Sequence, residues 1–88
     1  MDFNDARRWY WARSEQAFLK FLDAVEEAIE RLVSHGDTFA VIGRGCRAIR
    51  IKNYPHRIIY FIHPSGTIRI IAVQHDRRRP FYWSRRIR

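Results

Sequence analysis

The sequence predicts an α+β domain in which two N-terminal helices pack on an antiparallel β-sheet. Two observations carry this prediction. Hydrophobic residues recur every three or four positions up to about residue 35, and beyond Gly36 the period changes to two. Runs of strand-forming residues are then separated by short turns that contain proline or glycine, as in antiparallel hairpins. With 88 residues, the chain 1–88 is expected to form a single domain.

The longer helix is expected to begin at Ser14 and to end near Gly36. Ser14 suits the N-cap, and glycine suits the position that follows a helix. Its apolar residues form one stripe at the helical period: Phe18, Phe21, Leu22, Val25, Ala28, Ile29 and Leu32. A shorter helix is expected before it, from about Asp2 or Asn4 to Ala12. Together the two helices form a hairpin over residues 1–35.

Three strands are expected within residues 46–74. The first is Cys46–Lys52, and a flexible link at Gly43–Gly45 precedes it. The second and third are Arg57–Ile62 and Thr67–Val73, both rich in β-branched and aromatic residues. Turns separate the strands at Asn53–Pro55 and at His63–Gly66.

Positive charge is concentrated in the C-terminal half of the chain. The formal net charge is +8, and residues 1–40 carry five basic and eight acidic side chains. Residues 41–88 carry twelve basic side chains and one acidic side chain, Asp76, and they end in a basic tail over residues 75–88. Arginine suits planar, bidentate pairing with phosphate or carboxylate. This segregation favours an anionic partner over a merely solvated basic face.

The basic residues of the strands and the tail are the candidate binding residues. Alternation is expected to place Arg50 and Lys52 on the sheet face away from the helices. Aromatic residues between the tail arginines suit stacking on bases or insertion into a partner, although Trp83 is equally suited to packing over the helices. The candidates are Arg47, Arg50, Lys52, Arg57, His75, Arg77, Arg78, Arg79, Tyr82, Trp83, Arg85 and Arg86.

Several kinds of chemistry are disfavoured by composition. The single cysteine, Cys46, excludes a disulfide framework, fits a reducing cytoplasm, and is expected to be a buried, inert thiol. The four histidines lack metal-ligand spacing, so we expect no metal and no cofactor. Asp76 stands alone in the basic half, which disfavours hydrolysis by paired carboxylates. No apolar run approaches the roughly 18 residues of a membrane span, so no membrane partner is expected.

Three segments, in order along the chain, resemble the ParE/RelE-like toxins of bacterial type II toxin–antitoxin modules. Trp9-Tyr10 followed by Phe21–Leu32 resembles the helical hairpin of that family. Arg47–Tyr60, which contains Tyr-Pro-His-Arg-Ile-Ile-Tyr, resembles its strand pair, and Ile71–Trp83 resembles its ending (L/I)-A-V-x-H-x-x-R-x-P-x-x-W. The resemblance implies a curved antiparallel sheet and a cognate antitoxin that wraps over the toxin.

The resemblance leaves two targets open, because ParE-like toxins poison DNA gyrase whereas RelE-like toxins cleave messenger RNA in the ribosomal A site. In the RelE-like case the catalytic candidates are Arg50, Arg57, Arg77, Arg78 and Tyr82. Ala48, however, replaces a lysine of the RelE-like pattern, and the ending from His75 to Trp83 is closer to the ParE-like pattern. We therefore favour gyrase inhibition without catalysis. The alternatives are a ribosome-dependent endoribonuclease and a non-toxic basic adaptor.

Members of this family usually begin with a β-strand that precedes the first helix. This chain begins directly in the helix. We therefore expect either a start codon upstream or an open sheet edge. An open edge favours dimerisation, exchange of an element, or addition of an antitoxin strand.

Overall fold

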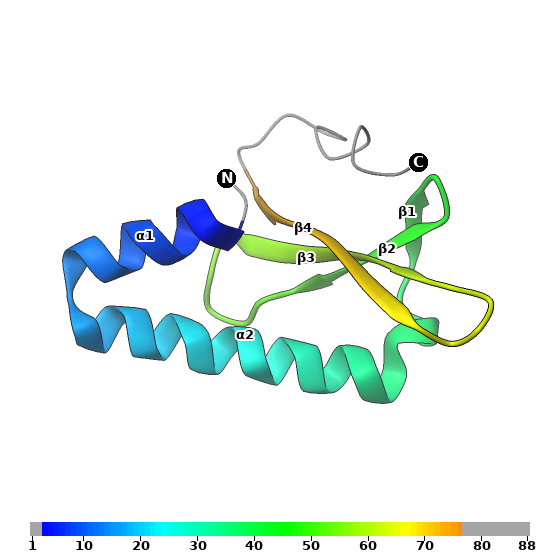
Figure 1. Ribbon diagram of the computed structural model, residues 1–88, viewed down its shortest axis with the longest axis horizontal. Helices are drawn as coiled ribbons and strands as arrows, with labels where there is room; N and C mark the ends of the chain where they lie inside the picture. Colours follow the sequence, from blue (N-terminus) through cyan, green and yellow to red (C-terminus); the bar gives the residue numbers. More distant parts are fainter. Residues whose placement is uncertain (1–2, 77–88) are drawn as a thin grey trace.

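The structure, a computed structural model, describes residues 3–76 and has the predicted α+β fold. Two helices form a hairpin and are followed by a sheet that lies against the second helix (Figure 1). The elements are α1 (Phe3–Arg13), α2 (Glu15–His35), the 3-10 turn η1 (Gly36–Thr38), β1 (Val41–Gly43), β2 (Cys46–Arg50), β3 (His56–Ile62) and β4 (Ile68–His75). Neither described helix is both long enough and apolar enough to cross a membrane.

Helix α2 forms where the apolar stripe predicts it. Its N-cap is Ser14, whose side-chain oxygen accepts a hydrogen bond from the backbone N–H of Ala17 at 2.9 Å. The buried residues of the helix all belong to the predicted stripe: Phe21, Val25, Ala28 and Leu32. Gly36 follows the helix as predicted, but with φ −57° it continues into η1 instead of adopting a left-handed cap. The backbone conformation at this position therefore does not require glycine.

The sheet has four strands, so the prediction of three strands was wrong by one. The missed strand is β1, which pairs with β2 through Val41 and Gly43. Gly43–Gly45, expected to be a flexible link, is the tight turn between these strands, and all three of its residues have positive φ. A three-residue strand that ends in glycine is too short to show a period of two, which is why the sequence did not reveal it.

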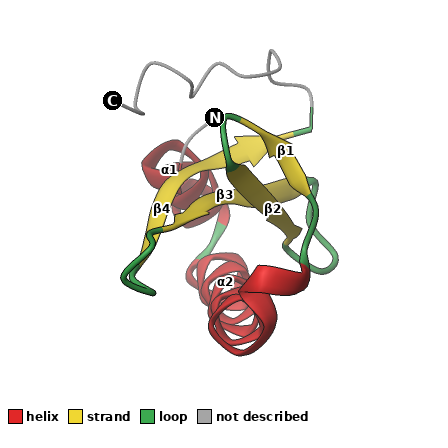
Figure 2. Cartoon of the chain, turned by 90° about the vertical axis from the view of Figure 1, so that its right-hand side faces the viewer, coloured by secondary structure: helices red, strands yellow, loops and turns green. Residues whose placement is uncertain are grey.

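The sheet is a meander in the order β1-β2-β3-β4, with every neighbouring pair antiparallel. β2 ends at Arg50, two residues before the predicted end, and β4 continues to His75, two residues past the predicted end. The register between β3 and β4 shifts after Ile59, which leaves Ile71 as an extra residue on β4. Figure 2 shows α2 along one face of the sheet, so the other face is available to carry a different set of side chains.

Apolar side chains are buried on both faces of the sheet. On the helix-facing side, Ile49, Ile51, Ile58, Tyr60 and Val73 pack with the stripe of α2 to form the main core. On the opposite side, a smaller cluster contains Cys46, Ile59, Ile71 and Ala72. Burial raises the pKa of the Cys46 thiol, so the thiol is protonated near neutral pH, in agreement with the expected inert role.

One buried hydrogen bond joins the end of α2 to the sheet. The hydroxyl of Tyr60 donates to the carbonyl oxygen of Gly36 at 2.6 Å, and both residues are buried. A Cβ atom at position 36 would lie 3.4 Å from the Tyr60 ring, in ordinary van der Waals contact, so the hydroxyl group of Tyr60 lies close to the backbone at this position. The contact satisfies a carbonyl at the helix end and fixes the angle at which the chain enters β1.

We expect Tyr60→Phe to lower the free energy of unfolding by about 1–3 kcal/mol, because the buried Gly36 carbonyl loses its donor. Urea denaturation followed by circular dichroism measures this change. Tyr54→Phe is the matched control, since Tyr54 is only half-buried, and it should cost less. Equal losses in the two variants would contradict the assigned role of the Tyr60 hydroxyl.

Candidate functional site

Two arginines and a glutamine form a row across three strands of the sheet. Arg50 of β2 is the register partner of Arg57 of β3, and Arg57 is the partner of Gln74 of β4. Their chain neighbours Ile49, Ile58 and Val73 belong to the core beneath α2. Because successive side chains of a strand point to opposite faces, the row lies on the face away from α2. This arrangement brings together two of the predicted binding residues, Arg50 and Arg57.

The charges in this row are only partly compensated. The guanidinium of Arg50 donates to both carboxylate oxygens of Asp76, at 2.9 Å and 3.4 Å. Nε of Arg57 donates to the side-chain oxygen of Gln74 at 3.1 Å, which satisfies a donor without cancelling the charge. Like charges on directly paired residues repel each other, so the carboxylate of Asp76 lowers the cost of this pair. One positive charge remains in excess among these four side chains.

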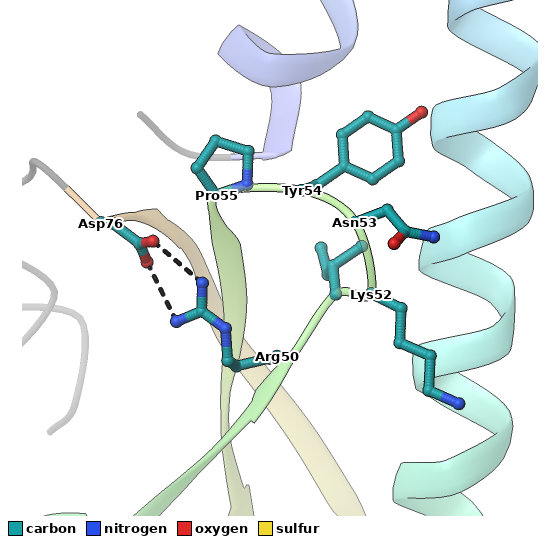
Figure 3. A pocket seen from close by; sticks show the side chains of 7 residues that line it. Arg50, Lys52, Asn53, Tyr54, Pro55 and Asp76 are labelled. Carbon is teal, nitrogen blue, oxygen red and sulfur yellow. Dashed lines mark hydrogen bonds and ion pairs between the residues drawn. The ribbon is translucent and has the colours of Figure 1, made fainter.

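Asp76 is held in place from two sides. Its backbone N–H donates to the carbonyl oxygen of Pro55 at 2.9 Å, and its carboxylate pairs directly with Arg50 in the lining of the depression that Figure 3 shows. The hydrogen bond from Arg50 holds the pKa of Asp76 below its usual value, and the charges of Arg50, His75 and Arg57 act in the same direction. Asp76 therefore serves as an ionised counter-ion and is a weak base.

An open depression of about 600 Å³ lies beside this ion pair, at the turn between β2 and β3. Asn53 adopts the left-handed conformation with φ +67°, which asparagine tolerates better than most residues. The depression is lined by Arg50, Ile51, Lys52, Asn53, Tyr54, Pro55 and Asp76. Its lining includes the cations Arg50 and Lys52 and the Tyr54 ring, which suit an anionic group attached to a flat or apolar body.

Lys52 does not share a face with Arg50, and that prediction was wrong. β2 ends at Arg50, the chain then turns, and the alternation of a strand no longer applies to Lys52. The ammonium of Lys52 lies 3.8 Å from the carboxylate of Glu27 on α2. Figure 3 shows the Lys52 side chain directed toward this helix and away from Arg50. Arg31 also binds Glu27 and lowers its pKa, while a guanidinium nitrogen of Arg31 donates to the Arg50 carbonyl oxygen at 2.8 Å.

A cluster of aromatic rings packs against the turn between β2 and β3. Tyr54 lies edge-on to Tyr10 of α1 and to Phe21 of α2, with ring centroids 5.3 Å and 5.2 Å apart. His56 packs against the same rings and lies edge-on to His75 at 5.0 Å. These contacts hold Tyr54 between the helical hairpin and the sheet and so shape one wall of the depression.

His56 is almost completely buried, with 1% of its surface exposed. Burial lowers its pKa to about 4, and the neighbouring His75 charge acts in the same direction. His56 is therefore neutral near pH 7. It belongs to the support of the site and not to its chemistry.

The remaining predicted binding residues are separated from this row or lie outside the described chain. Arg47 shares the helix-facing side with Ile49 and donates a hydrogen bond to the Phe39 carbonyl oxygen, so it holds the segment before β1 in place. His75 ends β4 beside His56. Arg77, Arg78, Arg79, Tyr82, Trp83, Arg85 and Arg86 lie outside the described residues.

The described part of the site supplies electrostatic binding. Its guanidinium and ammonium groups suit phosphate or carboxylate, whereas Asp76 is ion-paired and His56 is buried, so neither of these two groups suits proton transfer near pH 7. Within residues 3–76, no three histidine, cysteine, aspartate or glutamate side chains gather as a metal site would require.

Sequence reasoning found the two arginines of the site but missed the residues that position them. Asp76 was recognised as an isolated acid, and Gln74 and Glu27 were not singled out at all. Their roles depend on the register of β4 against β3 and on where α2 passes the turn. The one signal in the sequence was that Asp76 is the sole acid of the basic half.

One protein family matches nearly the whole chain. The model of the family described as "ParE toxin of type II toxin-antitoxin system, parDE" matches residues 1–80. The matched region includes both helices, all four described strands, and every side chain of the depression. Searches of curated proteins and of solved structures found no match.

We expect stability to fall as the pH is lowered from about 6.5 to about 4, because the unfolded chain binds a proton at His56 while the folded chain does not. The full effect is about 3 kcal/mol. His56→Gln should flatten the pH dependence of the free energy of unfolding in this window, measured by urea denaturation at several pH values. A slope that persists in His56→Gln would assign it to another group.

Removing the counter-ion of Arg50 should strengthen anion binding. We expect Asp76→Asn to elute from a heparin column at higher salt than Asp23→Asn, although both substitutions raise the net charge by the same amount. Asp23 is the control because it is exposed on α2, away from the row. Co-elution of the two variants would show that Asp76 does not limit access of anions to Arg50.

Proposed function

We propose that this chain, which belongs to the family of ParE toxins of type II toxin–antitoxin systems, inhibits growth by binding DNA gyrase. The observation that carries the proposal is the match of the ParE toxin family over residues 1–80. Inhibition by binding also agrees with the site, whose described residues offer charge and shape rather than groups for proton transfer. The proposed target places this activity in the cytoplasm.

The Arg50–Arg57 row is the proposed contact surface for the target. Arg50 is the more accessible of the two, with 63% of its side chain exposed, and Asp76 holds its guanidinium in one orientation. An acidic group of the target can replace Asp76 at the Arg50 guanidinium or bind it together with Asp76. The free-energy cost of this exchange is small because the ion pair lies at the surface. Arg57, on the neighbouring strand, is a second positive charge, and its hydrogen bond to Gln74 holds it in place.

Membership of a type II toxin–antitoxin family implies an antitoxin partner. We propose that the cognate antitoxin neutralises the chain by placing an acidic segment over the same row. The basic half of the sequence, with a net charge of +11 over residues 41–88, favours such a segment and speeds its association. Competition between antitoxin and target for Arg50 would then explain neutralisation without a change of fold.

A ribosome-dependent endoribonuclease is the second candidate. The observation in its favour is that two arginines proposed for catalysis, Arg50 and Arg57, lie on paired strand positions beside an open depression. Adjacent guanidinium groups stabilise the charge that develops on a phosphate during transesterification. The other proposed catalytic residues are Arg77, Arg78 and Tyr82, which lie outside the described residues.

The two functions separate in a pair of purified assays. We expect the full chain to inhibit supercoiling of plasmid DNA by gyrase and to leave messenger RNA intact in a reconstituted translation reaction. Arg50→Gln should raise the concentration for half-inhibition about tenfold, because a charge-assisted bidentate contact is lost. Lys20→Gln, an exposed residue of α2 with the same change of charge, should act like the parent chain.

Cleavage of translated messenger RNA, with gyrase unaffected, would replace the first proposal with the endoribonuclease. If neither assay responds and expression of the chain alone does not slow growth, both toxic activities are excluded and the basic adaptor is favoured. Urea denaturation of Arg50→Gln, compared with the parent chain, excludes misfolding as the cause of lost inhibition.

A further inference from the structure

The connection between α1 and α2 carries an exposed aromatic surface that the candidate site does not use. Trp9 and Trp11 of α1 are 43% and 59% exposed, and Leu19 of α2 is 51% exposed. Figure 1 shows this connection at the end of the hairpin that points away from the sheet. Large aromatic side chains left open to water indicate a contact surface.

The surface contains a groove with an aromatic base and a cationic rim. Trp11 lies edge-on to Phe18, with ring centroids 5.0 Å apart, so the two helices contribute one ring each. Together with Arg7 and Arg8 these rings line a depression of about 290 Å³. Its volume suits one or two apolar side chains rather than a whole domain.

The rim arginines are available for an anionic partner. Within residues 3–76, no acidic side chain forms an ion pair with Arg7 or Arg8, and both are exposed. Arg13, the third cation of this region, is engaged differently, because its guanidinium lies 3.7 Å above the centre of the Trp9 ring. That contact engages Arg13 away from the groove and leaves Arg7 and Arg8 as the accessible charges of its lining.

We propose that this hairpin tip, defined by Arg7, Arg8, Trp11 and Phe18, docks an acidic peptide segment of a partner protein. The segment would place an apolar side chain on the Trp11 and Phe18 rings and its carboxylates on the two arginines. The positive charges of Arg7 and Arg8 favour an acidic segment. The Trp11 and Phe18 rings favour a segment that also carries an apolar side chain. Tryptophan and arginine are the residues most enriched among those that dominate binding energy.

The proposed docking surface is distinct from the Arg50–Arg57 row and does not depend on the proposed function. The tip lies where α1 joins α2, whereas the row lies on β2 and β3 on the sheet face away from α2. A partner bound at one surface therefore leaves the other open. A purely acidic peptide would bind non-specifically to the many cations of a chain with net charge +8. The apolar anchor therefore distinguishes binding at the hairpin tip from binding at the arginine row.

The test compares two labelled peptides by fluorescence anisotropy with the full chain. One is a twelve-residue glutamate-rich peptide with two leucines, and in the other both leucines are serine. We expect the leucine peptide to bind at least about tenfold more tightly, because burial of one leucine on the rings supplies that factor. Trp11→Ala should bring the two affinities together, and Val33→Ala, another exposed apolar residue, should not.

A second pair of variants isolates the rim charges. We expect Arg7→Gln with Arg8→Gln to weaken leucine-peptide binding at least about tenfold more than Arg44→Asn with Arg69→Gln, which removes the same charge elsewhere. Asparagine suits position 44, where φ is +50°. Unfolding midpoints confirm that each variant is folded.

Equal affinity for the two peptides, or unchanged binding by Trp11→Ala, overturns the proposal. So does tip-dependent binding to phosphatidylglycerol vesicles without binding to the leucine peptide, which would assign the surface to a membrane. Self-association that Trp11→Ala abolishes, measured by sedimentation without peptide, would instead assign it to a second copy of the chain. Failure of gyrase inhibition with intact peptide binding would affect only the proposed function.

Discussion

The structure depends on burying one stripe of α2 against the middle of the sheet. Phe21, Val25, Ala28 and Leu32 pack on Ile49, Ile51, Ile58 and Tyr60, and each fully buried valine, leucine, isoleucine or phenylalanine side chain contributes about 1.5–3 kcal/mol. The Tyr60 hydroxyl then ties the end of the helix to the strand that the helix covers. With the helix fixed, the direction of every side chain on β2 and β3 is fixed too, because a shift of one residue would expose the whole apolar set. The position of the arginine row is therefore a consequence of the core.

This constraint explains how a domain of 88 residues displays two adjacent arginines. Strand positions next to the core isoleucines must point away from α2, so Arg50 beside Ile49 and Arg57 beside Ile58 become register partners on that face. Two paired positive charges repel each other and oppose folding. The Asp76 carboxylate binds Arg50, whereas only the neutral amide of Gln74 binds Arg57. Full neutralisation would remove the repulsion and with it the attraction for an anionic partner. The partial compensation is what a binding surface requires.

Much of the fold was predictable from the sequence because its signals are local. The α2 stripe, the Ser14 cap, and the β3–β4 hairpin each depend on residues close together in the chain. Strand β1 was not predictable, because three residues ending in glycine carry no periodicity. In the site, Arg50 and Arg57 could be selected from charge and alternation, whereas the Asp76 contact spans 26 positions and needs the sheet register. Lys52 was misplaced for a similar reason: alternation holds only while the strand lasts, and β2 ends two residues before it.

The charges of the molecule also restrict how a partner can approach. Asp23, Glu26 and Glu30 are exposed along α2. This helix begins at the hairpin tip and covers the sheet face opposite the arginine row. An acidic partner is repelled by this helix and attracted to the two cationic regions, so its approach is oriented before any contact forms. The effect operates over about 8–10 Å at physiological ionic strength, comparable to the distance between packed elements. Segregated charge therefore provides orientation, and the uncovered aromatic and guanidinium groups provide the contacts that hold the partner once it arrives.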